Sequence, residues 1–261
     1  MVRILKNILF VAIISISVGA VRVSAQEESK LNIFLRQELN SGQFSQIESS
    51  TINRKFSDLI VFLKEKKSKY RSDKAFLEFT FYYVHRKFLG KYEQYVTLAE
   101  MFSKDQKYDC VTGTTLYSLI LDELGYQFEI RETDYHVYLL AFVDDKKFLL
   151  ESTDPLYGFA HDPKEIKKRQ DFVINDARII NEKLAMTGVS SNNSQVNVSV
   201  INNSVTLKEL VGLHFYNQAL RQFNDQNHGE AFRLATIAQG IYPSNRIKNA
   251  ASFMFAVAFE D

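Results

Sequence analysis

The chain has 261 residues, of which 46% are hydrophobic and 13% aromatic, so it can bury a substantial core and is not a disordered protein. Its 32 basic and 31 acidic residues nearly cancel and are interleaved, which excludes the basic surface that a nucleic-acid-binding protein needs. A single cysteine excludes an internal disulfide, so stability must come from packing.

The first 25 residues predict a secretory signal peptide. Arg3 and Lys6 precede an apolar stretch over residues 8–21, and small residues lead to a cleavage site after Ala25. The stretch is shorter than the roughly 18 residues of a membrane span, so we expect cleavage and no stable span afterwards. Cleavage removes three cations and no acid, changing the net charge from +1 to −2. The expected location is secreted or periplasmic.

Residues 26–187 predict one α+β domain that begins with helices. Apolar residues recur at spacings of three and four between Ser29 and Leu89, as at Leu31, Phe34 and Leu35. Residues 75–89 are rich in aromatic side chains and predict a buried helix. Gly90 is expected to close it in the left-handed conformation.

A second helix is predicted over residues 110–124, with Asp109 as its N-cap and Gly125 just past its end. Short segments rich in β-branched and aromatic residues follow it. They predict a small antiparallel sheet packed on this helix. The segments are residues 127–132, 136–143 and 148–151, with a turn at 144–147.

The remaining chain divides into an Asn/Ser-rich linker or loop over residues 188–206 and a helical segment over 207–261. The helical segment resembles one tetratricopeptide unit, and two interpretations stay open: a hairpin docked on the main domain, or a groove that binds a protein partner. The residues that carry this resemblance are Phe215, Asn217, Ala219, Ala231, Ala238 and Pro243.

Cys110 and His136 form the strongest candidate site. A cysteine in the first turn of a helix lies where unpaired N–H groups favour the thiolate, and an imidazole on a following strand can exchange the proton. A carboxylate would orient the imidazole. The hairpin register favours Glu151, and Asp154 at the strand end remains the alternative.

Other interpretations of these residues are simpler. Cys110 as a small core residue and His136 as an ordinary strand residue would need no chemistry. Cys110, His136 and Asp154 supply three potential metal ligands, but no close-spaced pair anchors them, so neither a metal nor a cofactor is predicted. For an oxyanion, the backbone N–H of Cys110 and an upstream donor, Gln106 or Tyr108, are the candidates.

These residues also resemble a known family. Tyr108-Asp109-Cys110-Val111-Thr112-Gly113-Thr114, His136-Val137 and Leu149-Leu150-Glu151-Ser152-Thr153-Asp154-Pro155 together are similar to the transglutaminase-like superfamily of papain-type folds. The resemblance covers roughly residues 81–159 and implies Cys110 as nucleophile and His136 as base. The family usually carries an aspartate where Glu151 stands, which leaves Asp154 open, and a tryptophan that this chain lacks.

The resemblance implies thiol acyl transfer without fixing the substrate, since the family includes crosslinkers, peptidases, amidases and inactive members. We therefore expect an exported cysteine-dependent peptidase or amidase that hydrolyses amide bonds in peptide, protein or cell-envelope material. The alternative is an inactive scaffold or binding module that captures a protein partner through its C-terminal helices.

Overall fold

The computed structural model describes residues 29–42, 45–186 and 201–259, so the predicted signal peptide and most of the predicted linker lie outside the described residues. None of the helices in these ranges is long and apolar enough to cross a membrane. The helices are α1 (Lys30–Asn40), α2 (Gln46–Lys67), α3 (Asp73–Phe88), α4 (Leu98–Phe102), α5 (Cys110–Glu123), α6 (Pro163–Met186), α7 (Leu207–Asn224), α8 (His228–Ile241) and α9 (Asn245–Phe259). The strands are β1 (Lys91–Tyr92), β2 (Lys107–Tyr108), β3 (Gln127–Thr133), β4 (Val137–Val143), β5 (Lys146–Leu150), β6 (Phe159–Ala160) and β7 (Asn202–Val205).

The main sheet has the strand order β6-β5-β4-β3-β7, and every neighbouring pair is antiparallel. Asp144 and Asp145 both adopt left-handed φ angles, 47° and 61°, in the two-residue turn between β4 and β5. Such turns match the twist of hairpin strands, and aspartate tolerates this conformation. The predicted antiparallel sheet is confirmed, and its turn is two residues shorter than expected.

The predicted linker or loop over residues 188–206 extends too far, because Asn202–Val205 forms β7. This strand pairs with β3, placing Ile130 opposite Val205 and Thr133 opposite Asn202. The signal was absent from the sequence because the strand is short and Asn-rich and its partner lies about seventy residues earlier in the chain.

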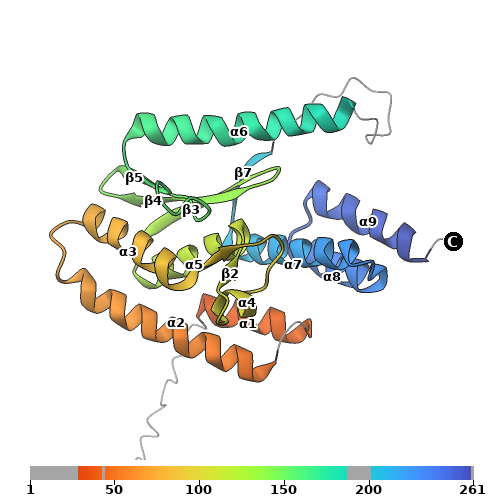
Figure 1. Cartoon of the computed structure of the whole chain (residues 1–261), viewed down its shortest axis with the longest axis horizontal. Helices are drawn as coiled ribbons and strands as arrows, with labels where there is room; N and C mark the ends of the chain where they lie inside the picture. The colour runs from red at the N-terminus through yellow and green to blue at the C-terminus, as the bar shows by residue number, and fades with distance from the viewer. Residues whose placement is uncertain (1–28, 43–44, 187–200, 260–261) are drawn as a thin grey trace, which may run out of the picture.

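Helices cover both faces of the sheet (Figure 1). α6 lies across one face over a small core that includes Tyr138, Leu149 and Ile166. α5 packs on β3 and β4 from the other side, within the main core, and α1 to α3 form the outer helical layer there. The mixed helix and sheet architecture is that of an α+β protein.

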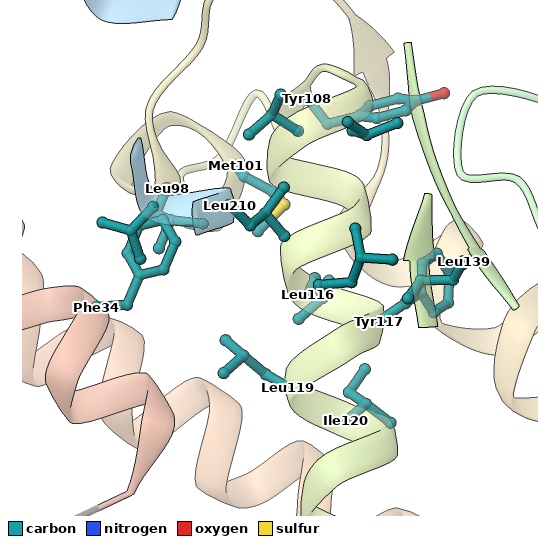
Figure 2. Packing of buried hydrophobic residues seen from close by; sticks show 14 of the residues in the cluster. Phe34, Leu98, Met101, Tyr108, Leu116, Tyr117, Leu119, Ile120, Leu139 and Leu210 are labelled. Carbon is teal, nitrogen blue, oxygen red and sulfur yellow. The ribbon is translucent and has the colours of Figure 1, made fainter. Parts of the chain in front are cut away.

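α5 is buried on all sides from Val111 to Leu121. Figure 2 shows side chains from other elements, among them Phe34, Met101 and Leu210, gathered around it. Its internal hydroxyls find carbonyl partners: Thr114 Oγ1 donates to Val137 O at 3.2 Å and Ser118 Oγ to Thr114 O at 2.8 Å. These bonds make burial of a Thr/Ser-rich helix tolerable.

The N-terminal helices are confirmed, but the role predicted for Gly90 is wrong. α3 ends at Phe88 with Leu89 as its cap, and Gly90 is not left-handed. Its N–H donates to Gln106 O at 2.9 Å, where the chain enters the parallel β1–β2 pair. Gly125, by contrast, has φ 75° just past α5, as predicted.

The helical prediction for the C-terminal segment is confirmed. α7 and α8 pack closely on each other, with Ala231 and Ala238 fully buried. A Cβ at Gly212 of α7 would lie only 2.5 Å from Tyr242 Cβ, so this glycine permits the approach. α7 also packs on α5 and places Leu210 in the main core, which joins the hairpin to the rest of the fold.

Candidate active site

Cys110 is the first residue of α5, and its cap is fixed by Asp109. Oδ1 of Asp109 accepts bonds from the Thr112 N–H at 2.7 Å and from the Thr112 hydroxyl at 2.9 Å. The Asp109 side chain is buried, and this burial raises its pKa despite those bonds. Cys110 itself is half-buried. The cap therefore presents the sulfur at the positive end of a rigid helix.

Gly113 lets α5 approach the segment after β5, and Gly158 lets the following loop close tightly on that segment. A Cβ at Gly113 would lie 2.7 Å from Ser152 Oγ, closer than real Cβ contacts. A Cβ at Gly158 would lie 2.2 Å from Glu151 O, where the Glu151 N–H donates to Gly158 O at 2.8 Å. Both positions require the absence of a side chain, and Glu151 is thereby held near the start of α5.

His136 and Glu151 are joined by a 2.5 Å contact between Nε2 and Oε2. Oε1 of Glu151 accepts bonds from the Thr153 N–H at 3.0 Å and the Thr153 hydroxyl at 2.8 Å. Burial alone would raise the pKa of Glu151, but the His136 charge and these bonds outweigh it and lower that pKa. Glu151 is consequently a fixed carboxylate aimed at the imidazole.

The environment also favours the imidazolium form of His136. Burial would lower its pKa, yet the charge of Glu151 and hydrogen bonds to Cys110 and Glu151 raise the pKa well above its usual range. Because Nε2 faces Glu151, Nδ1 is the nitrogen left for the sulfur. The Tyr138 ring stacks on the imidazole with centroids 6.4 Å apart. The structure thus brings Cys110, His136 and Glu151 together.

Asp154, the alternative third member, is not part of this set. Its Oδ1 accepts bonds from the Leu156 N–H at 3.1 Å and the Tyr157 N–H at 2.8 Å, and Oδ2 lies 3.6 Å from Arg169 Nη1. The chain turns away from the strand direction in the loop that Gly158 closes, so this carboxylate organises the loop instead of the imidazole.

Cys110 and His136 line one cavity of about 270 Å³, which we call the Cys110 cavity. The C-terminal helices build part of its wall with Tyr216 of α7 and Arg246 of α9. Arg246 is itself held by the buried carboxylate of Glu132 and by the carbonyl of Asp134. No local sequence pattern predicts this wall, because Tyr216 and Arg246 lie 106 and 136 positions after Cys110.

The sequence also missed two tyrosines in the Cys110 cavity. Burial raises the pKa of Tyr92 and of Tyr95, and both side chains line this cavity. Tyr95 adopts a left-handed φ of 63°, and its carbonyl accepts a 3.0 Å bond from the buried Gln218 side chain. Strained non-glycine residues of this kind cluster at functional sites.

The two upstream oxyanion donors suggested by the sequence point elsewhere. The Gln106 amide donates to the Lys87 carbonyl, and the buried Tyr108 hydroxyl lies 3.5 Å from Nε2 of His85. His85 in turn donates to Ser152 O at 3.1 Å and so supports the segment that carries Glu151. Neither Gln106 nor Tyr108 lines the Cys110 cavity.

No protein-family model, curated protein or solved structure matches this chain. Within the part of the chain that the structure describes, no cluster of three or more His, Cys, Asp or Glu side chains has the arrangement of a metal site. What the site does is therefore inferred from its own geometry.

Proposed function

We propose that this protein is an exported cysteine-dependent acyl-transfer enzyme, a peptidase or amidase of the transglutaminase-like superfamily with a papain-type core. The observation that supports it best is that His136 lines one cavity with Cys110 and is bonded to Glu151 through Nε2. A nucleophile at a helix start, a base and a carboxylate that orients the base are the parts such catalysis requires.

Each group has a definite role in the proposed reaction. The Cys110 thiolate attacks the amide carbonyl carbon, and the oxyanion receives hydrogen bonds from the Cys110 N–H and a tyrosine hydroxyl of the cavity. The imidazolium of His136 gives its proton to the leaving nitrogen as the C–N bond breaks, which leaves a thioester. Water, deprotonated by His136, then attacks the thioester, releasing a carboxylic acid and restoring the thiolate–imidazolium pair.

Glu151 contributes by holding the imidazole and stabilising its positive charge. Its carboxylate is one methylene longer than aspartate, but the two bonds from Thr153 fix it against Nε2 of His136. The longer side chain of Glu151 therefore orients the His136 imidazole as firmly as an aspartate would. This geometry supports an active site despite the departure from the family pattern.

Export and substrate class belong to the same proposal. The predicted signal peptide directs the chain to the periplasm or the medium, where peptide, protein and cell-envelope amides are the available substrates. Hydrolysis is proposed over crosslinking because crosslinking requires water to be kept from the thioester.

Acylation by p-nitrophenyl acetate tests the proposal without knowledge of the natural substrate. The folded protein should release a burst of p-nitrophenolate equivalent to one acetyl group per chain, and mass spectrometry should locate that group on Cys110. Cys110→Ala is the control and should show no burst. Acetylation that is no faster than in the urea-unfolded chain would overturn the proposal.

The exposed phenylalanines of α9 favour a second candidate, a binding module that acts through its C-terminal helices. Phe253 is 58% exposed and Phe259 61% exposed, and such apolar surface often marks a protein interface. Under this alternative, Cys110→Ala keeps the cellular function of the protein and Phe253→Ser with Phe259→Ser loses it. The acyl-transfer proposal expects the reverse.

A further inference from the structure

A second cavity of about 680 Å³ is also lined by His136 and lies between α6 and the face of the sheet that α6 covers. We call it the α6 groove. Tyr138 and Leu149 form its floor, and Phe172 and Val173 of α6 form its wall. It adjoins the Cys110 cavity, because Thr133, Tyr135 and His136 line both.

The chemistry of the site assigns a direction to a substrate that spans the two cavities. The carbonyl carbon must meet the sulfur in the Cys110 cavity, and the leaving nitrogen must meet the imidazole that protonates it. The chain beyond that nitrogen then continues past His136. The α6 groove adjoins the Cys110 cavity at this residue and offers the space for it.

The lining of the groove indicates what it binds. Three aromatic side chains around it are strongly exposed, namely Tyr135 at 47%, Tyr157 at 67% and Phe172 at 70%. The guanidinium of Arg169 is already paired with Glu165 at 2.8 Å. Lys168 also lines the groove, and the exposed aromatic surface together with the floor of Tyr138 and Leu149 suits a bulky apolar side chain.

We infer that the α6 groove binds the amine side of the substrate and selects peptides with an aromatic or large aliphatic residue directly after the scissile amide bond. This inference rests on the proposed function, since it takes Cys110 as nucleophile and His136 as the acid. It adds a substrate preference that Cys110, His136 and Glu151 do not themselves determine.

Amine capture of the acetyl-enzyme tests the inference. In this step the amine nitrogen attacks the thioester carbonyl, the C–S bond breaks, the amine proton passes to His136, and an acetamide leaves. Phenylalaninamide and glycinamide are added at equal concentration to enzyme acetylated by p-nitrophenyl acetate. After division by their rates with a free thioester, phenylalaninamide should be captured on the order of 10-fold better, the size expected for one apolar side chain in an open pocket.

Variants of the groove show whether the preference for phenylalaninamide arises there. Phe172→Ala combined with Tyr157→Ala should reduce the ratio to near one, while Ile47→Ala on α2, an equally exposed apolar residue at 77%, should leave it unchanged. Equal capture of both amines by the wild type, or a full preference in the double variant, would overturn this inference while the acetyl-enzyme still forms. Failure to form an acetyl-enzyme would instead overturn the proposed function and this inference with it.

Discussion

Among the residues that the structure describes are two histidine–glutamate pairs, and they differ in what surrounds them. His214 and Glu38 join α7 to α1, and both side chains are fully buried. His136 and Glu151 lie at the end of the sheet with side chains 20% and 13% exposed. In both pairs burial alone would lower the pKa of the histidine, and the glutamate charge reverses that effect.

The neighbours of the two imidazoles separate their roles. His214 packs against the rings of Phe34 and Phe215, with centroids 5.4 and 5.9 Å away, and is sealed from solvent. His136 lines one cavity together with Cys110 and also lines a second. The same chemical pair therefore joins two helices in one region and is reachable from two cavities in the other. The proposed site is defined by solvent access and by a nearby nucleophile, Cys110, and not by the histidine–glutamate pair alone.

The largest effect should come from removing the accessible imidazole. His136→Ala should slow acetylation of Cys110 by at least about 10³-fold. The thiol would lose its proton acceptor, and the thiolate would lose its counterion. Stopped-flow release of p-nitrophenolate measures the rate. His161→Ala, an exposed histidine outside both pairs, is the control and should retain the wild-type rate. A loss of less than about tenfold would contradict the role assigned to His136.

The buried pair should matter for stability instead. His214→Ala should lower the free energy of unfolding by about 3–5 kcal/mol, because Glu38 is left as a buried charge without compensation. Urea titration measures it, and His161→Ala should change it by less than about 0.5 kcal/mol. The double variant Glu38→Leu with His214→Leu should recover much of the loss. A His214→Ala protein as stable as the wild type would show that the pair carries no structural role.

A smaller effect is expected where α5 approaches the Glu151 segment. Gly113→Ala should lower the free energy of unfolding by about 1–3 kcal/mol, since its Cβ would overlap Ser152. Gly240→Ala is the matched helical control, with nothing within 4 Å of its added Cβ, and should stabilise by about 0.4–1 kcal/mol. If both variants behave alike in urea, the close approach of α5 to Ser152 is not a constraint.

The pH dependence of Cys110 acetylation tests whether Glu151 controls the pKa of His136. Because the Glu151 charge raises the pKa of His136, Glu151→Gln should lower that pKa and leave burial as the main influence. His136 should then lose its proton at a lower pH than in the wild type. The alkaline limb of the profile, where the acetylation rate falls as His136 deprotonates, should shift to lower pH with it. The His136 contribution to stability should likewise be complete below about pH 6.5 and be lost as the pH rises through the raised pKa. An unchanged alkaline limb in Glu151→Gln would contradict the coupling.

Local features of the fold were predictable because the residues that encode them are neighbours in sequence. Asp109 caps α5 as its spacing to Thr112 allows, and the hairpin register follows from the turn at Asp144 and Asp145. That register places Leu139 opposite Leu150, so Glu151 follows β5 beside the start of β4, which His136 precedes. Proximity of Glu151 to His136 follows from it.

The remaining features depend on contacts between distant parts of the chain. Asp154 competes with Glu151 in the sequence, and only the loop closed by Gly158 turns its carboxylate away. The cavity wall from Tyr216 and the strand β7 depend on how the C-terminal segment docks. His214 and Glu38 are 176 positions apart, and no local pattern pairs them.

The pH dependence of iodoacetamide labelling of Cys110 tests the central claim most directly. The wild type should react faster than the urea-unfolded chain at about pH 6, well below the range near 8.5 where a free thiol ionises. His136→Ala should lose that advantage. Equal rates for the folded wild type, the variant and the unfolded chain across the whole pH range would contradict a thiolate held by His136.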